Sequence, residues 1–435
     1  MHPTYCYARF EQISENLLRM AITDTVQEGP SSIVPNWVAS GRLRRLLILS
    51  SEGPNLRAAG GILLYRLLKD YPEDSLVVIE RYADPQRGQL RCRYHSLTAP
   101  WRRFEQCRFH RWKRSLRGFG LVPDVRPETI EDLLAGFRPE IVLCVMQHAA
   151  YYEAAWTYAR ALDLPLIVIV HDVNDQFEPV LPIAREAVRR RDAAFYRYAK
   201  RRLCVSPEME GLCADIYGVR GEVMYPNRSE DLQPRPFELA GRLKHATGLT
   251  VGFAGNLNYG YGDEVLRLLP AFRASGSRLV IFSNPPGSSC AELLHAPDCI
   301  EFRGFMPSCQ AWEAIQTDCD AVLLAYPNPA GRMEQLYRNH FPSKLPEYLA
   351  LGMPVIVTGP DYATGVKWAR FHPEAVASYS GTDIEGVAHL FERLRDLGEI
   401  RVALAKAAFE AGNRDFDPAA IRAQFLEALE TSCTS

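Results

Sequence analysis

The chain has 435 residues, with 50 Lys and Arg against 52 Asp and Glu and a formal net charge of -2. This length predicts two or three domains with substantial cores, and the near-neutral charge excludes a general polyanion binder. The sequence has no apolar run of bilayer-spanning length, and its first residues lack the basic start and apolar centre of a signal peptide. Eleven scattered cysteines without a Cys-x-x-Cys pair favour reduced thiols over disulfides or zinc. We therefore expect a cytoplasmic protein.

The first half of the chain alternates apolar runs with amphipathic segments. An irregular extension over residues 1–40 comes first. Continuous apolar runs that alternate with helices are typical of a parallel sheet covered on both faces. The predicted strands are "RRLLILSSE" (44–52), "SLVVIE" (75–80), a run ending near Met146, a run ending at Val170, and the start of "RRLCVSPEMEGLCADIYG".

A proline-rich, polar stretch over residues 226–248 interrupts this pattern and predicts an interdomain link. The pattern then resumes with "LTVGFAGN", "RLVIFSN", "CIEFRGF", "CDAVLLAY" and "PVIV" as strands. The predicted fold class is α/β, with two Rossmann-like doubly wound domains facing a cleft. The expected parts are an extension (1–40), an N-terminal domain (41–230), a C-terminal domain (231–408), and terminal helices (409–435) that pack back on the N-terminal domain.

The strongest chemical signal is "RNHFPSKLPEYLALGMPVIVTG", which runs from 338 to 359. Ser343 is a predicted N-cap, and Pro346 is tolerated in a first helical turn. Lys344 beside the helix N-terminus could neutralise a phosphate, and Glu347 could accept hydrogen bonds from ribose hydroxyls. The structural alternative is an acidic residue that stabilises the helix dipole and a solvated lysine.

A second signal is the turn in "GFAGNLNYGYGDEVL", where Gly255, Gly260 and Gly262 would allow a ligand to approach the backbone. The turn is not Gly-x-Gly-x-x-Gly, so a nicotinamide cofactor is disfavoured and a plain strand-to-helix turn stays open. A glycine-bearing loop with Gly60 and Gly61 follows the first strand, and it could face the same cleft or merely turn the chain.

Polar residues directly follow two predicted strands of the first half. His171 and Asp172 follow one strand and His148 follows another, at the edge where α/β sheets bind ligands. His171 could act as a donor or an acid-base group, and a purely structural histidine is the alternative. The sequence contains no nucleophile elbow and no metal-spaced cluster.

A basic, aromatic stretch runs from Arg91 to Gly118, and a second basic run covers 189–202. Both could contact anionic lipid headgroups at the inner membrane face or attract an anionic acceptor. Solvated helix faces are the alternative, and the chain has no nucleic-acid-binding motif.

Taken together, these motifs resemble the GT-B glycosyltransferases, most closely the retaining glycosyltransferase family 4 (glycosyl transferases group 1). The resemblance covers residues from about Arg44 to the end, and its most specific part is "FPSKLPEYLALGMPVIVTG". It implies a transferase that takes a nucleotide-diphosphate sugar as donor and needs no cofactor or metal. The implied acceptor is a glycan, a lipid-linked sugar or a small molecule.

The resemblance also implies roles for particular residues. Glu347 would hold the donor ribose, and Lys344 the pyrophosphate. His171 would contact the transferred sugar near the reacting carbon. The other residues implied in donor binding are Gly255, Asn256, Arg338, Asn339 and Ser343, and those implied near the acceptor or cleft are Gly60, Gly61, His148 and Asp172.

Three positions depart from the family pattern. Asn339 stands where the first motif glutamate is expected, and Asn256 and Tyr261 stand where the family has arginine and lysine. Lys344, with Arg338, must then supply the phosphate charge. The departures keep two alternatives open, a non-catalytic scaffold or sugar-binding protein of this fold and a nucleotide-sugar epimerase or phosphorylase. A dinucleotide oxidoreductase is a weaker third alternative.

Overall fold

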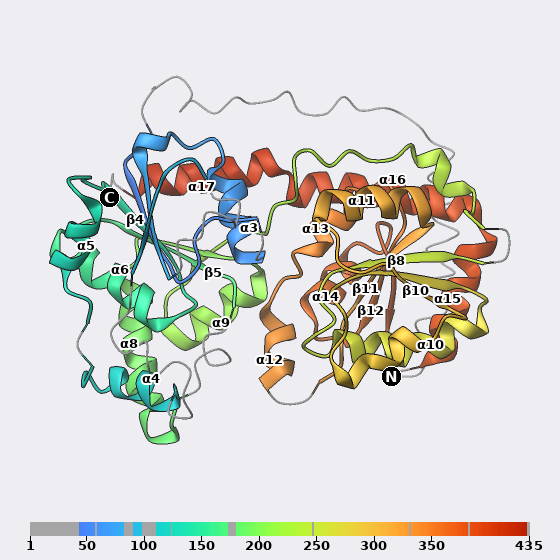
Figure 1. Ribbon diagram of the computed structural model, residues 1–435, viewed down its shortest axis with the longest axis horizontal. Helices are drawn as coiled ribbons and strands as arrows, with labels where there is room; N and C mark the ends of the chain where they lie inside the picture. Colours follow the sequence, from blue (N-terminus) through green and yellow to red (C-terminus); the bar gives the residue numbers. More distant parts are fainter. Residues whose placement is uncertain are drawn as a thin grey trace. The chain divides into compact units, whose positions relative to one another are not determined.

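The computed structural model describes residues 43–56, 59–81, 90–97, 110–122, 124–172, 180–245, 248–329, 332–381 and 383–432 (Figure 1). The predicted extension over residues 1–40 lies outside these ranges. The described chain divides into two compact units. The N-terminal unit holds the residues up to Asn227 together with Asn339–Phe341 and the residues from Pro418 on, and the C-terminal unit holds the rest.

The N-terminal unit is built on a parallel seven-stranded sheet with strand order β3-β2-β1-β4-β5-β6-β7. The four predicted apolar runs form β1, β2, β4 and β5, and every residue in these strands is buried. Helices lie on both faces, which explains why the strands are apolar throughout (Figure 1). The strands are β1 (Leu46–Leu49), β2 (Leu76–Glu80), β3 (Arg93–Ser96), β4 (Ile141–Val145), β5 (Leu166–Val170), β6 (Arg201–Cys204) and β7 (Glu222–Val223).

The described helices of this unit alternate with the strands as the sequence predicts, except that among the described elements β3 directly follows β2 and α5 directly follows α4. Helix α9 begins after Ser206, whose Oγ accepts a hydrogen bond from the Met209 N–H at 3.0 Å. The last helix of the chain, α17, contacts α3, and Arg422 forms an ion pair of 2.6 Å with Asp70. The helices are α3 (Ala59–Leu68), α4 (His110–Gly118), α5 (Pro127–Leu134), α6 (Ala149–Ala161), α8 (Arg185–Tyr198), α9 (Pro207–Tyr217) and α17 (Pro418–Thr431), with short 3-10 turns at Glu73–Ser75 and Pro182–Ala184.

The C-terminal unit repeats this architecture on a parallel six-stranded sheet with strand order β10-β9-β8-β11-β12-β13. The central strands β8, β11 and β12 are buried along their whole length. The two doubly wound parallel sheets confirm the predicted fold class. The strands are β8 (Thr250–Ala254), β9 (Arg278–Phe282), β10 (Ile300–Phe302), β11 (Ala321–Ala325), β12 (Val355–Gly359) and β13 (Ala377–Ser380).

Helices cover both faces of this second sheet as well (Figure 1). Its helices are α10 (Tyr261–Ala274), α11 (Ser308–Asp318), α12 (Arg332–Asn339), α13 (Lys344–Leu349), α14 (Thr364–Phe371), α15 (Ile384–Asp396) and α16 (Gly398–Phe416), with 3-10 segments at Phe237–Gly241 and Ser288–His295. No helix in the described ranges combines the length and apolarity needed to cross a bilayer.

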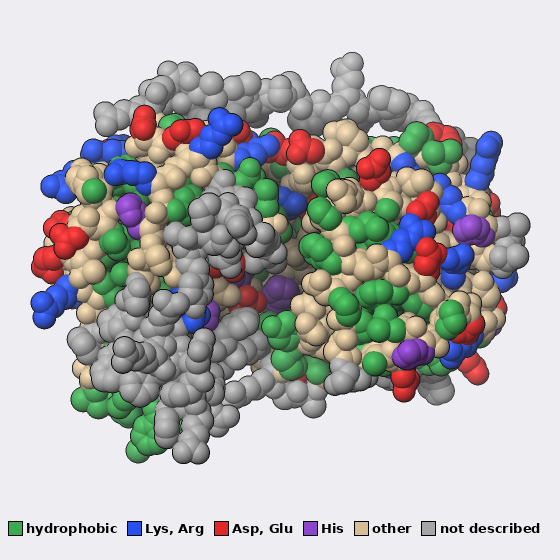
Figure 2. Space-filling view, viewed as in Figure 1, with side chains coloured by type: hydrophobic (Ala, Val, Ile, Leu, Met, Phe, Trp, Pro, Cys, Tyr) green, Lys and Arg blue, Asp and Glu red, His purple; other side chains and the backbone are tan. Residues whose placement is uncertain are grey.

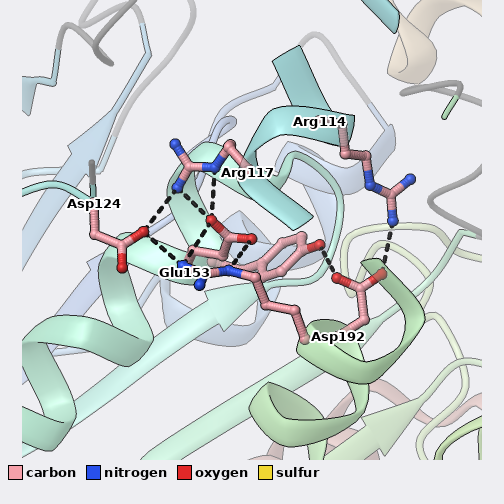
Figure 3. A network of polar contacts seen from close by, with 7 residues as sticks. Arg114, Arg117, Asp124, Glu153 and Asp192 are labelled. Atoms are coloured by element: carbon pink, nitrogen blue, oxygen red, sulfur yellow. Dashed lines mark hydrogen bonds and ion pairs between the residues drawn. The ribbon is translucent and has the colours of Figure 1, made fainter. Parts of the chain in front are cut away.

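The basic stretch from Arg91 to Gly118 differs from the expectation of a solvated or lipid-facing surface. Within it, β3 is an edge strand and α4 carries two buried arginines, which Figure 3 shows in a polar network. Arg114 donates to Asp192 at 2.7 Å, and Arg117 donates to Glu153 at 2.6 Å. These two charges are neutralised inside the unit, so they cannot contact lipid headgroups. Arg114 and Arg117 therefore cannot carry the expected lipid contact, and a contact through the other residues of the stretch stays a prediction.

Candidate functional site

The candidate residues follow strands at, or one strand away from, the places where the strand order of each sheet reverses. In the N-terminal sheet β1 pairs with β4, and in the C-terminal sheet β8 pairs with β11. At each reversal the connections that follow the two neighbouring parallel strands lead in opposite directions across the sheet. This divergence leaves space for a ligand at the carboxyl ends of the two strands. The strand β8 ends at Ala254, directly before Gly255, and β5 ends at Val170, directly before His171.

The structure brings Gly255 and Lys344 into direct contact. Gly255 has φ +127°, and a Cβ built on it would lie 2.1 Å from Lys344 Cε and 2.2 Å from Nζ. The lysine side chain therefore occupies the place that any side chain at 255 would need. The turn therefore needs a glycine at position 255, because the Lys344 side chain approaches the backbone there too closely for any Cβ.

The amino group of Lys344 lies in an aromatic setting. Its Nζ lies 4.7 Å from the ring centroid of Phe253 and 5.3 Å from that of Tyr261. Within the described ranges no carboxylate forms an ion pair with it. Burial lowers the pKa of Lys344 to about 8, because the charged form loses hydration. A partly buried cation without a carboxylate partner is suited to bind an anion.

Tyr261 is one of the three departures from the family pattern, and its position is informative. The residue begins α10, and its ring also packs edge-to-face on Tyr337 at 5.6 Å. The position that has a lysine in the family thus carries the ring that borders Lys344. Lys344 is the cation at this place, whereas the family pattern also has basic residues at positions 256 and 261. The ring of Tyr261 adds a cation–π contribution to the setting of Lys344.

Glu347 lies on the same short helix as Lys344 and is 4% exposed. Its Oε2 accepts a hydrogen bond of 3.4 Å from the Ser229 N–H. The carboxylate also offsets the effect of burial on Arg228, whose pKa is nevertheless lowered mainly by desolvation. Glu347 is thus held by the segment that opens the C-terminal unit.

Of three other predicted donor residues, Asn256 and Arg338 have local partners. Ser343 stands at the predicted N-cap position of α13, but its backbone is helical and its side chain makes no capping hydrogen bond. The Asn256 Oδ1 accepts from the Asn258 N–H at 2.8 Å. Arg338 donates to Glu334 at 2.9 Å and stacks 4.4 Å from the Tyr362 ring. Arg338 is therefore already neutralised by a neighbour, unlike Lys344.

In the N-terminal unit the structure gathers His171, Asp172 and a histidine from much later in the chain. Asp172 Oδ2 lies 3.4 Å from His171 Nε2, and its Oδ1 lies 3.2 Å from His340 Nδ1. Gly60 completes the cluster, since a Cβ there would meet His171 Cε1 at 2.9 Å. Two of the predicted residues, Gly60 and His171, are therefore in contact.

The two imidazoles set the charge of the carboxylate between them. Burial alone would raise the pKa of Asp172, but the His340 hydrogen bond and both rings outweigh it and lower that pKa. Burial would lower the pKa of His340, but its bond to Asp172 and the carboxylate charge raise it. In the described part of the chain, His171 Nδ1 is buried and makes no hydrogen bond. With Nε2 directed at Asp172, Nδ1 is the ring nitrogen that could bond a ligand.

The other two residues predicted near the acceptor, Gly61 and His148, make contacts that stabilise the local backbone. The backbone of Gly61 accepts from the Asn55 N–H at 3.0 Å, and a Cβ at 61 would meet the Asn55 side chain at 2.1 Å. His148 precedes α6, and its carbonyl accepts from the Tyr151 N–H at 3.0 Å. Its neighbour Gln147 accepts from Ser51 Oγ at 3.3 Å, which links the ends of β4 and β1.

Sequence reasoning missed His340. The segment that contains it is part of the N-terminal unit, because Ser206 Oγ donates to the Asn339 carbonyl at 2.8 Å and Tyr225 packs on Phe341 at 4.9 Å. The only signal in the sequence was the position of His340 beside Asn339 in the most specific motif. Its partner, Asp172, lies too far away in sequence for any local pattern to indicate.

Two further features of the described residues bear on the site. They contain no group of three or more His, Cys, Asp and Glu placed to hold a metal ion. A surface cavity of about 590 Å³ in the C-terminal unit is lined by Arg273, Arg278 and Asp298 among others. It lies where β9 and β10 begin, at the sheet edge opposite the one described here.

The class of protein is indicated by comparison with known families. Residues 68–227 match the model of the glycosyl transferase 4-like domain. This range runs from the end of α3 to the last residue of the N-terminal sheet region, and it includes His171 and Asp172. Residues 68–227 are thus similar to the glycosyl transferase 4-like domain, and the resemblance is confirmed there.

Solved structures extend the likeness to both units. HepE from Anabaena in complex with UDP is 16% identical with a TM-score of 0.62, covering 89% of this chain and 100% of that one. Sucrose-phosphate synthase from Thermosynechococcus elongatus has a TM-score of 0.62 at 15% identity, covering 89% and 99%. The α,α-trehalose 6-phosphate synthase from Burkholderia multivorans has 0.59 at 14%, covering 90% and 98%. These glycosyltransferases share the GT-B fold of the chain. No curated protein matches it in sequence.

Proposed function

We propose that the protein is a glycosyltransferase that moves a sugar from a nucleotide-diphosphate sugar to an acceptor, with retention of the anomeric configuration. The observation that carries this proposal is the position of the Lys344 amino group. Its amino group lies at the carboxyl end of β8, against Gly255 and two aromatic rings, with a pKa lowered to about 8. A diphosphate would supply the negative charge that this position lacks.

The donor would bind in the C-terminal unit. Lys344 would neutralise the diphosphate, and Glu347 would accept hydrogen bonds from the ribose. The backbone at Gly255 and Asn256 would line the nucleotide, and Arg338 and Ser343 complete the proposed donor set of this unit. Asn339, also proposed to bind the donor, is part of the N-terminal unit. When the nucleoside diphosphate departs, negative charge grows on its outer phosphate. Because that charge is larger in the transition state than in the bound donor, Lys344 would accelerate the reaction and not only tighten binding.

The acceptor would bind in the N-terminal unit. The buried Nδ1 of His171 would bond the substrate, while Nε2 of the same ring lies 3.4 Å from Asp172 Oδ2. We assign His171 to a hydroxyl of the transferred sugar near the reacting carbon. His340 would keep Asp172 ionised, and Gly60, Gly61 and His148 would lie along the acceptor.

For the identity of the donor and of the acceptor we propose only classes of compound. HepE has also been solved with UDP-glucose, with a TM-score of 0.59 to this chain, which makes UDP-glucose the first donor to try. A glycan or a lipid-linked sugar is the proposed acceptor, in the synthesis of a polysaccharide or glycoconjugate.

A non-catalytic protein of the same fold is the second candidate. The absence of basic side chains at Asn256 and Tyr261 and of a carboxylate at Asn339 favours it. Such a protein would bind a nucleotide sugar or a glycan without releasing the nucleotide. An epimerase would instead convert the donor sugar without any acceptor.

Donor turnover distinguishes these candidates. The wild type and the variants Lys344→Ala and Lys406→Ala are incubated with UDP-, GDP-, ADP- and TDP-glucose and followed by NMR, with water as the default acceptor. Lys406 is exposed on α16 of the same unit and serves as the control. We expect one donor to release its nucleoside diphosphate and α-glucose first, at a rate reduced at least 100-fold only in Lys344→Ala. Equal rates in all three proteins would contradict the proposal, and an epimerised donor would support the epimerase.

A further inference from the structure

Helix α4 has its amphipathic faces reversed. Among its described side chains, Arg114 and Arg117 are buried, at 3% and 2% exposure, together with the small Ser115, whereas Trp112 is 51% exposed. Leu116, on the same helix, and Phe119, just after it, are also exposed. A helix on the surface of a globular unit normally turns its apolar face to the core and its charges to water. The outward apolar face of α4 therefore needs an explanation.

The orientation of α4 is fixed by strong polar contacts. Figure 3 shows Arg114 with Asp192 on one side, and Arg117 with Glu153 and Asp124 on the other. Asp192 also accepts from Tyr152 Oη at 2.7 Å. Rotating α4 to bury Trp112 would leave Asp192 and Glu153 as buried carboxylates without Arg114 and Arg117, which is strongly unfavourable. The exposed apolar face is thus imposed by the ion pairs.

Neighbouring segments enlarge this apolar face. Leu121 follows α4, and Ile183 lies on the Pro182–Ala184 turn, which contacts α4; these residues are 68% and 81% exposed. The Leu181 N–H donates to Ser115 Oγ at 3.0 Å, which holds the turn against the helix. Figure 2 shows apolar side chains gathered at this end of the unit. We call this surface the α4 face: Trp112, Leu116, Phe119, Leu121 and Ile183.

Cations flank the α4 face. Arg185 follows the Ile183 turn by one residue and begins α8, and its side chain is exposed. Arg189 and Arg190 lie one turn further on and are 57% and 75% exposed at the side chain. The one acidic residue among positions 185–190 is Glu186, which forms ion pairs with both of those arginines. Three arginines against one glutamate leave this rim positive.

We propose that the α4 face docks on the surface of an anionic lipid bilayer. Exposed Trp, Phe and Leu side chains are the residues that enter the boundary between headgroups and acyl chains, and adjacent arginines are attracted to anionic headgroups. The positive rim selects an anionic surface over a neutral one. Trp112 and Leu116 belong to the stretch Arg91–Gly118 that was expected to contact lipid, but apolar side chains carry the proposed contact while Arg114 and Arg117 point inward. The proposal does not depend on the proposed glycosyl transfer.

Vesicle sedimentation tests this proposal. The wild-type chain is mixed with vesicles of phosphatidylcholine alone or with 40% phosphatidylglycerol, at increasing NaCl. Three variants accompany it: Trp112→Ser/Leu116→Ser in the α4 face, Arg185→Gln/Arg190→Gln in the rim, and the control Leu162→Ser/Phe371→Ser. Leu162 and Phe371 are 42% and 81% exposed but lie elsewhere. The substituted side chains are exposed, so melting temperatures should match the wild type.

We expect the wild type and the control to bind anionic vesicles at least tenfold more tightly than neutral ones, with affinity falling as NaCl rises. The α4-face variant should lose binding to both kinds of vesicle, and the rim variant should lose the preference for anionic vesicles. Equal binding by the wild type and the α4-face variant would overturn the proposal. A lipid-free dimer in ultracentrifugation that only the α4-face substitutions abolish would assign the face to a second copy, and would also overturn it.

Discussion

At the scale of single residues, the most informative pair is Gly255 and Lys344. The sequence placed both in a donor site, on separate motifs almost ninety residues apart. What it could not indicate is that they touch, since the lysine side chain crosses the space beside the glycine. The same holds for Gly60 and His171. Residue types at strand ends could be predicted, whereas the contacts between them depend on how the strands pair.

Substitution of Gly255 tests this packing. A methyl group in Gly255→Ala would displace Lys344, and φ +127° would strain the alanine by about 1–3 kcal/mol. Gly304→Ala is the matched control, because Gly304 has φ +77° but open space around its Cβ position. Both variants should lose stability in urea denaturation. Only Gly255→Ala should also lose at least tenfold in affinity for a nucleoside diphosphate, measured by calorimetry; unchanged affinity would show that Lys344 does not need this position.

His340 gives a pH-dependent prediction. Its pKa is raised in the folded protein, so its contribution to stability is fully present below the unfolded pKa of about 6.5 and is lost as the pH rises through the folded value. The pKa of Asp172 is lowered, so its contribution is present above about 3.8 and is lost as the pH falls through the folded value. The pair should therefore stabilise most between about pH 4 and 6.5.

We expect His340→Gln to lower the free energy of unfolding by about 2 kcal/mol at pH 5.5, and by progressively less above neutral pH. His389→Gln is the control, since His389 pairs with Glu392 at 2.9 Å on an exposed helix face. Urea denaturation from pH 4.5 to 8.5 measures both. A loss for His340→Gln that does not change with pH would mean that the ring acts by packing and not by charge.

At the scale of elements, the sequence predicted best where burial is complete. The strands β1, β2, β4 and β5 are apolar on both faces, so a continuous apolar run marks each one. The edge strand β3 carries Arg-Tyr-His-Ser and gave no such signal. Helix α4 was misjudged because its arginines are buried by carboxylates from other helices, which composition alone cannot indicate.

The polar network beneath α4 makes a prediction about stability. Removing one partner, as in Arg117→Leu, leaves Glu153 buried with less compensation and should cost about 3 kcal/mol. Arg191 remains 2.9 Å from Glu153 and would limit the loss. Arg189→Leu, which removes an exposed ion pair on α8, should leave the midpoint of urea denaturation unchanged. Equal midpoints for both variants would contradict the structural role of the network.

At the scale of the whole molecule, the sequence predicted two doubly wound sheets because each shows its own alternation of apolar runs and helices. It could not predict how the chain is shared between the units. Asn339–Phe341 is part of the N-terminal unit although its neighbours on both sides are part of the other. The cause is a set of long-range contacts, such as that of Ser206 with Asn339, which no local pattern encodes.

The central claim is that the C-terminal unit binds a nucleoside diphosphate through Lys344. The most direct measurement is thermal stability of the wild type, Lys344→Ala and Lys406→Ala with UDP, GDP, ADP, TDP or NAD. A ligand at a hundred times its dissociation constant should add about 2.7 kcal/mol, which is a clear rise in melting temperature. We predict that one nucleoside diphosphate stabilises the wild type and Lys406→Ala, that Lys344→Ala gains much less, and that NAD has no effect. Stabilisation by none of the diphosphates, or equal stabilisation of all three proteins, would contradict the claim.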